Sequence, residues 1–154
     1  MLSEERVAVN GIELNVASAG EGPPVVLLHG FPHTWRIWSE VIGPLAAQHR
    51  VLAPDLRGFG ASTMSDQLDA DTLARDLEAL LERVGRATVV ALDAGVPGAF
   101  LAALRRPDLV SRLVLIEGTL PGGDFPAPWW FGFHAVPGLT ERVVRPAEYV
   151  GWFY

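Results

Sequence analysis

Apolar and polar positions along the first 118 residues alternate between two kinds of segment. Short apolar runs, typical of strands buried on both faces, occur at 22–30, 50–55, 87–93 and 109–118. Longer segments with helical spacing of their apolar residues occupy 34–49, 71–85 and 96–107. Gly85 is a suitable residue to end the second of these helices, and Pro44 is expected to break or kink the first.

The order of these segments predicts the fold class. Residues 6–20 contain two short β patterns joined by Asn10-Gly11, a strong signal for a hairpin. The remaining segments alternate strand and helix, which favours parallel strands with right-handed crossovers. We therefore expect an α/β fold, a mostly parallel sheet with an N-terminal β-hairpin and helices on both faces. Ligands bind to such sheets at the carboxyl ends of the strands.

The composition changes after Gly118. Residues 119–138 are rich in proline, glycine and aromatic residues and show no strand alternation. Residues 139–154 look helical in two pieces that Pro146 separates. We predict a boundary near residue 120, with residues 1–120 forming the main domain and residues 121–154 beginning a second one.

Charge and composition exclude several classes of function. The net charge of −6 argues against binding to nucleic acid or to an anionic membrane surface. The absence of cysteine excludes disulfides, thiolate zinc sites and a cysteine nucleophile. The acidic N-terminus is unlike a signal peptide, and no apolar run approaches the roughly 18 residues of a membrane helix. We expect a cytoplasmic chain without a membrane span. Because His33, His49 and His134 lack the spacing of metal ligands, we expect no metal site. The chain has neither a GxxxxGK(S/T) loop nor a GxGxxG motif, so we expect no nucleotide cofactor.

Asp93 ends a buried apolar run, where an acid is costly unless the fold uses it. Ala91 and Gly95, two residues before and after it, are small, as the tight strand-to-helix turn called a nucleophile elbow requires. Asp93 is then either the N-cap of the following helix or a carboxylate nucleophile. The motifs HGFP at 29–32 and DLRGFGAS at 55–62, in this order before the turn, favour the nucleophile.

A carboxylate nucleophile suits displacement at sp³ carbon, such as opening an epoxide or expelling a halide, through an ester intermediate. The N-terminus of the helix after Asp93 favours its ionised form. We expect the backbone N–H groups of Phe31 and Ala94 to form an oxyanion hole when water attacks that ester.

Three segments, 26–38, 51–62 and 89–118, resemble the N-terminal half of α/β-hydrolase fold proteins. The aspartate at the elbow is similar to that of the epoxide hydrolase and dehalogenase branch. The resemblance implies that Asp93 is the nucleophile, that Phe31 and Ala94 donate to the oxyanion, and that Trp35 lines the substrate pocket. It also implies a small apolar substrate of the epoxide type and no cofactor.

Residues 128–144 look like the start of the lid, or cap, of bacterial epoxide hydrolase-like proteins. The resemblance places Trp130 and Phe131 in the substrate pocket, although packing within the lid would equally explain both. They stand where fluoroacetate dehalogenases carry a His-Trp pair, and Ala94 stands where dehalogenases carry Trp or Arg. The chain therefore favours the epoxide hydrolase-like branch, with a haloacetate dehalogenase-like enzyme as an alternative. No residue is identified as the proton donor of the lid.

In this fold the catalytic histidine and its acidic partner follow the nucleophile along the chain. After Asp93 the only histidine is His134, which falls in the predicted lid. We therefore expect a truncated hydrolase that is inactive as this fragment. The missing C-terminal half, with its Asp or Glu and its His, would come from a continuation or from a complementary chain. The alternative is a non-catalytic remnant or binding module that keeps the elbow by descent.

Overall fold

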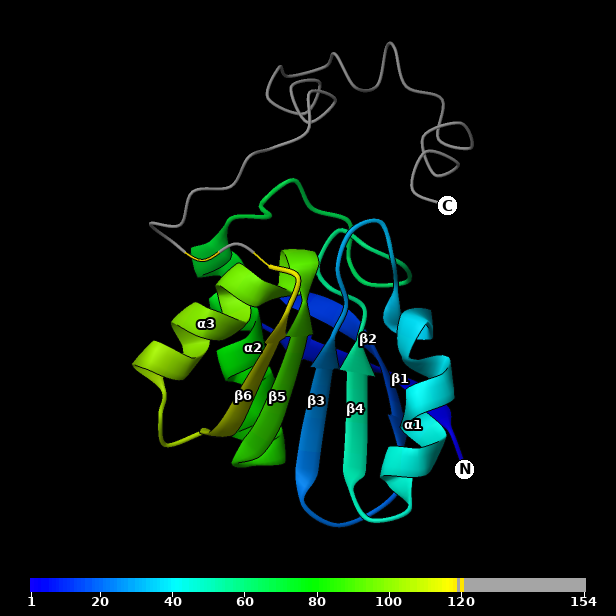
Figure 1. Cartoon of the computed structure of the whole chain (residues 1–154). Coiled ribbons are helices and arrows are strands. Elements are labelled where there is room, and N and C mark those ends of the chain that lie inside the picture. The colour runs from blue at the N-terminus through cyan, green and yellow to red at the C-terminus, as the bar shows by residue number, and fades with distance from the viewer. Residues whose placement is uncertain (119, 121–154) are drawn as a thin grey trace. The chain divides into compact units, whose positions relative to one another are not determined.

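The computed structural model describes residues 1–118 and 120 (Figure 1). The chain divides into two compact units, Met1–Pro121 and Gly122–Tyr154, and every element below belongs to the first. Trp130, Phe131 and the predicted lid at 121–154 lie outside the described residues.

Six strands form one mixed sheet, as the sequence predicts. The strands are β1 (Ser3–Val9), β2 (Ile12–Ala19), β3 (Pro24–Leu28), β4 (Arg50–Pro54), β5 (Ala87–Leu92) and β6 (Val110–Ile116). Their order across the sheet is β1-β2-β4-β3-β5-β6. The pairs β1–β2 and β2–β4 are antiparallel, and the other three pairs are parallel. The predicted α/β fold with an N-terminal hairpin is confirmed.

The hairpin turns at Asn10 and Gly11, whose φ angles of 40° and 79° are both positive, as a type I′ turn requires. Its first strand begins at Ser3, three residues before the predicted start at Arg6. The early part of β1 is charged and exposed, so it lacks the alternation that identifies a half-buried strand.

Helices cover both faces of the sheet. The helical elements are η1 (Trp35–Trp38), α1 (Ser39–Ala46), α2 (Ala70–Val84), η2 (Asp93–Gly95) and α3 (Val96–Arg105). Along α2, Asp69 caps the start by accepting the Thr72 N–H, and Gly85 follows the end with a φ of 87°. Pro44 does not break α1, which continues through it to Ala46. Glu40, whose carbonyl loses its partner there, is exposed and can be solvated.

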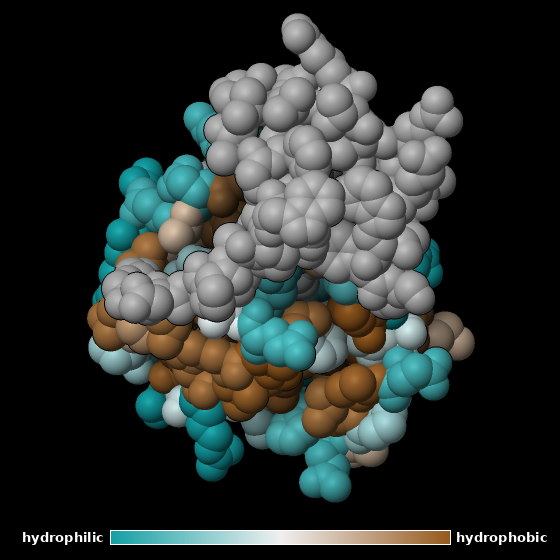
Figure 2. All heavy atoms as spheres, turned by 45° about the horizontal axis from the view of Figure 1, so that its top comes forward, coloured by the Kyte–Doolittle hydropathy of each residue, from teal (hydrophilic) through white to brown (hydrophobic). Residues whose placement is uncertain are grey.

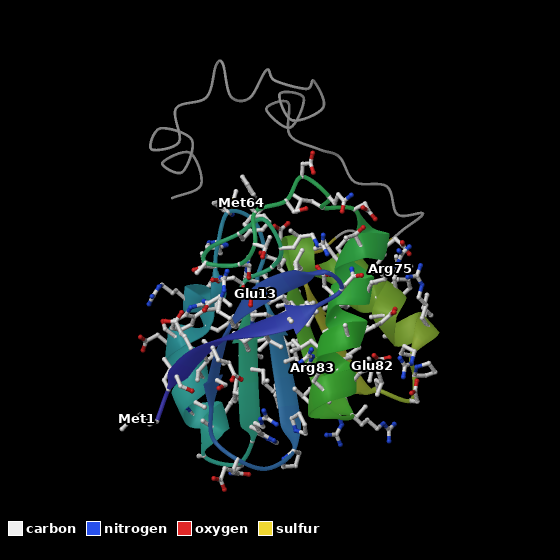
Figure 3. All side chains as sticks on the ribbon, turned by 180° about the vertical axis from the view of Figure 1, so that it is seen from behind. Met1, Glu13, Met64, Arg75, Glu82 and Arg83 are labelled. Carbon is white, nitrogen blue, oxygen red and sulfur yellow. The ribbon has the colours of Figure 1, made fainter. Side chains whose placement is uncertain are left out.

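The sheet separates two apolar layers because alternate side chains of a strand point to opposite faces. On one face α2 and α3 pack with Val89 and Ala91 of β5. Figure 3 views this side, with α2 and the hairpin in front of the sheet. On the other face α1 and η1 pack over β2, β3 and β4, and Val90 and Leu92 border this second layer.

Within the described part of the chain, no helix packs on β6 on the α1 side of the sheet (Figure 1). Val114 and Ile116 of β6 are 45% and 37% exposed, although both are large and apolar. Figure 2 shows apolar residues gathered on this side of the molecule. The second half of β6 is therefore an apolar border of the sheet, whereas Ser111 and Arg112 in its first half are exposed and polar.

No helix among the described residues has the length and apolar character needed to cross a membrane.

Candidate active site

The backbone turns sharply between β5 and α3. Leu92 is extended, with φ −114° and ψ 135°, whereas Asp93 has a φ of 45°. A left-handed conformation is uncommon outside glycine and costs energy, so the surrounding structure must hold it in place. The single turn η2 then leads directly into α3. Asp93 consequently stands at the carboxyl end of the central strands, where parallel sheets bind ligands.

Two glycines make room for this turn. A Cβ atom on Gly95 would lie 2.9 Å from the His29 carbonyl oxygen, so only glycine lets α3 start this close to the loop after β3. A Cβ atom on Gly30 would lie 2.5 Å from the Cβ of Asp93 and 2.8 Å from its Oδ2. The need for small residues around Asp93 predicted Gly95, whereas Gly30 was missed, although it belongs to the HGFP motif.

The carboxylate of Asp93 faces the loop that follows β3. The backbone N–H of Phe31 donates a hydrogen bond to Asp93 Oδ2 over 2.8 Å. This contact joins residues that are 62 positions apart in the chain. Two of the residues singled out from the sequence, Asp93 and Phe31, therefore meet at one point.

The capping interpretation of Asp93 does not hold. The N-cap of α3 is Gly95, and the N-cap of η2 is Leu92, and neither helix start has a side-chain cap. The acid at this position therefore has no local structural task in starting α3. Ala94 lies next to it in η2 and is half-buried, and its role as a second donor stays a prediction.

His29 is fully buried and both of its ring nitrogens have partners. Its Nε2 accepts the Leu56 N–H over 2.9 Å, so Nδ1 carries the proton and donates to the Gly30 carbonyl, also over 2.9 Å. Burial lowers the pKa of His29 below its ordinary value, and hydrogen bonding to Gly30 and the charge of Asp55 oppose this only in part. His29 is therefore a neutral residue that ties two loops together and does not fit the role of a general base.

Asp55, at the end of β4, is the second link between these loops. Its Oδ1 accepts the Trp35 N–H over 2.8 Å, and its Oδ2 accepts the Ala61 N–H and the Asn15 Nδ2, each over 3.0 Å. Its carboxylate is buried, at 2% exposure of the residue. Asp55 therefore fixes its own turn and also holds the distant loop that carries Phe31.

Trp35 is buried in the apolar layer under α1, at 4% exposure. Its indole Nε1 donates to Glu4 of β1 over 3.1 Å, and the Arg36 guanidinium lies 4.7 Å from the ring centre. The contacts of Trp35 are thus those of a core residue. Its place in a substrate pocket stays a prediction.

Aromatic rings make contacts between the loop after β3 and the loop after β4. The ring of Phe59 meets His29 edge to face at 5.3 Å and Phe31 at 6.3 Å between ring centres. Phe31 itself is 37% exposed, so one side of the Asp93 site carries an apolar ring that solvent reaches.

A buried ion pair anchors the loop after β4 to α2. Arg57 binds Asp76 through Nε and Nη2, both over 2.7 Å, and Asn10 donates to the same carboxylate over 2.8 Å. The hydrogen bond and charge of Asp76 raise the pKa of Arg57, which stays protonated. No motif in the sequence pointed to this pair, because its members are separated by 19 positions and lie in different elements.

Glu117 follows β6 with a φ of 49° and is exposed. Gly118, next to it, passes against the side chain of Val96 at the start of α3, where a Cβ atom would overlap. Within the described ranges, no three His, Asp or Glu residues gather in a way that could hold a metal ion.

The sequence and the fold were compared with known proteins. A family model described as the alpha/beta hydrolase fold matches residues 23–149. A soluble epoxide hydrolase from Corynebacterium sp. (strain C12) is 38% identical over 134 residues, which cover 82% of this chain and 47% of the relative.

Solved structures are similar to this chain in both fold and sequence. The crystal structure of Cfl2 from Burkholderia cenocepacia matches with a TM-score of 0.88 and 34% identity, over 97% of this chain and 57% of that one. The epoxide hydrolase VrEH1 from Vigna radiata matches with a TM-score of 0.71 and 35% identity, over 74% and 38%. The chain spans about half the length of the relatives it matches.

Proposed function

Because the chain belongs to the α/β-hydrolase fold family, we propose that it carries the nucleophile of an epoxide hydrolase-like enzyme. The observation that carries the proposal is the Asp93 carboxylate on a strained turn, 2.8 Å from the Phe31 N–H. A strained acid that caps no helix and faces a backbone donor is typical of a functional site. The substrate class follows from the names of the relatives and from the chemistry of a carboxylate nucleophile.

In the first step Asp93 Oδ1 attacks a ring carbon of the epoxide, and the bond between that carbon and the ring oxygen breaks. The ring oxygen stays bonded to the neighbouring carbon as an alkoxide and takes up a proton from solvent. The product is an ester between Asp93 and a hydroxyalkyl group. The N–H of Phe31 orients the carboxylate by holding its other oxygen.

In the second step water gives a proton to a base and attacks the carbonyl carbon of the ester. The carbonyl oxygen becomes an oxyanion, which the Phe31 N–H, joined by that of Ala94, stabilises. Collapse of this intermediate breaks the ester bond, the departing alkoxide takes the proton back from the base to give the diol, and the Asp93 carboxyl group loses its proton to solvent. The Asp93 carboxylate is restored.

The base of the second step needs a titratable nitrogen or oxygen near the ester. His29 does not supply it, since both ring nitrogens are already hydrogen-bonded. We therefore assign the base and its acidic partner to a continuation of the polypeptide or to a complementary chain. The coverage of only about half of each relative supports this assignment.

The 154-residue chain incubated with styrene oxide tests the proposal. We expect one covalent adduct per chain, located at Asp93 by peptide mass spectrometry, and no sustained release of diol. Asp93→Asn is the matched control because it keeps the shape of the side chain and removes the nucleophile.

Absence of an adduct in the wild-type chain, or equal adduct formation by Asp93→Asn, would favour the non-catalytic binding module instead. Continuous diol production by this chain would contradict the assignment of the base to another segment.

A further inference from the structure

We propose that Asp55 is a positioning residue that holds the Phe31 N–H against Asp93. The proposal rests on the proposed function only for its kinetic test. Its geometric part concerns the two loops that meet at the site, residues 29–35 and residues 55–62.

The loop at 29–35 is held at both ends by consecutive residues of the other loop. At its start, the ring of His29 accepts the N–H of Leu56 over 2.9 Å. At its end, the N–H of Trp35 donates to Asp55 Oδ1 over 2.8 Å. Between them the chain turns tightly, with the His33 N–H bound to the Gly30 carbonyl over 2.9 Å. Phe31 lies inside this short closed turn, so fixing both ends fixes its N–H.

Asp55 is itself held rigidly. Its own N–H donates to the Asn15 carbonyl over 2.8 Å, and its carbonyl accepts the Ser62 hydroxyl over 2.7 Å. Its second carboxylate oxygen accepts from Ala61 and Asn15. Gly60 passes so close to this carboxylate that a Cβ atom there would overlap it. The carboxylate oxygen that accepts from Trp35 is therefore fixed by contacts with β2 and with residues 60–62.

The chemistry of this position requires a carboxylate. Both oxygens face N–H donors, and the residue is 2% exposed, so no water shell can replace a lost acceptor. An asparagine of the same shape has one acceptor oxygen and one NH₂ group. In either orientation its NH₂ group would face an N–H donor, either that of Trp35 or those of Ala61 and Asn15.

The consequence reaches Asp93 through the backbone. Releasing the Trp35 end of the loop lets the Phe31 N–H move away from Asp93 Oδ2. Since displacements of about 1 Å at a reacting group cost up to a hundredfold in rate, Asp55→Asn should slow bond formation without changing how the epoxide binds.

The geometric test follows the Phe31 amide by hydrogen exchange in the 154-residue chain. We expect Asp55→Asn to speed exchange of this amide at least tenfold relative to amides of β3 in the same sample. Asp69→Ala is the matched control, because it removes the cap of α2 and the hydrogen bonds of its side chain go to Thr72 rather than to either loop. Asn15→Ala, which removes one donor to Asp55, keeps the test informative if Asp55→Asn does not fold. Unchanged exchange of Phe31 in the folded variants would overturn the proposal, whether or not the chain reacts with epoxides.

The kinetic test measures adduct formation at Asp93 against styrene oxide concentration. We expect Asp55→Asn to lower the maximal rate constant on the order of tenfold to a hundredfold and to leave the half-saturating concentration within about twofold. A purely structural role would lower only the amount of adduct, through the fraction of folded protein. A maximal rate constant equal to that of wild type would overturn the proposal, and a wild-type chain without adduct would instead count against the proposed nucleophile.

Discussion

Gly30 and Asp93 lie so close together that the Asp93 side chain fits only because Gly30 has no side chain. The Cβ of Asp93 occupies the space where a Cβ of Gly30 would stand. Gly30 does not have a positive φ, so it is not required for backbone freedom at its own position. It is required because the backbone of one loop must reach the carboxylate of the other.

Gly30→Ala tests this requirement. A methyl group at 2.5 Å from the Asp93 Cβ meets a residue on a strained turn that cannot move freely. We expect a loss of about 1–3 kcal/mol in the free energy of unfolding, as for overpacked cores, together with loss of adduct formation at Asp93. Urea unfolding and mass spectrometry measure the two effects.

Gly43→Ala is the control for Gly30→Ala. Beyond its chain neighbours and the backbone of its own helix, nothing lies within 4 Å of a Cβ at Gly43, which sits inside α1. This variant should change the free energy of unfolding by less than about 1 kcal/mol, because contact of the new Cβ with the Pro44 ring opposes the gain in helix propensity. Equal effects at both glycines would mean that the close approach of Gly30 to Asp93 does not matter.

At the scale of elements, the pairing of Arg57 with Asp76 connects the loop after β4 to the middle of α2. Both residues are buried, at 3% and 4% exposure, and the guanidinium binds the carboxylate in a two-pronged fashion. Two charges removed from water stabilise a fold only while each has its partner. The position of this loop, and with it Asp55, therefore depends on α2.

Removing one member of this pair should cost more than removing both. We expect Asp76→Leu to lower the free energy of unfolding by about 3–5 kcal/mol, since it leaves the Arg57 charge buried and unpaired. Arg57→Met should behave similarly, and the double variant should be more stable than either single one. A double-mutant cycle from urea unfolding measures the coupling, and additive losses would argue against it.

The sequence predicted those features that depend on neighbouring residues, namely the ends of a helix and a sharp turn. The helical spacing of apolar residues and Gly85 gave the bounds of α2 within one residue, and small residues around Asp93 predicted the sharp turn. The tie from Trp35 to Asp55 and the contact of Phe31 with Asp93 span 20 and 62 positions. The spacing of apolar residues gives no information on contacts between residues so far apart in the chain, so these contacts became visible only in the folded structure.

At the largest scale, the sheet formed by the described residues has two unlike borders. One is β1, where Ser3, Glu4, Glu5 and Arg6 are all exposed. The other is β6, where Val114 and Ile116 are exposed beside Val90 and Leu92 of β5. Unpaired strand edges with apolar side chains attract other strands, whereas charged edges repel them.

Val114→Lys should therefore reduce association of the chain. We expect wild type to form a larger species as its concentration rises, and the variant to remain monomeric over the same range in sedimentation velocity. Glu5→Lys, at an exposed position of the opposite border, should leave the association unchanged. Association that persists in Val114→Lys would show that another surface is responsible.

The difference between these borders also limits how far such assembly can grow. A molecule in which both edge strands of a sheet can pair with other strands can add copies without end and form a fibre. Among the described residues, one border of the sheet exposes Val114 and Ile116 and the other exposes charged residues. A twofold pair that joined β6 to β6 would leave only its two β1 borders unpaired, so we expect assembly through this edge to stop at two copies.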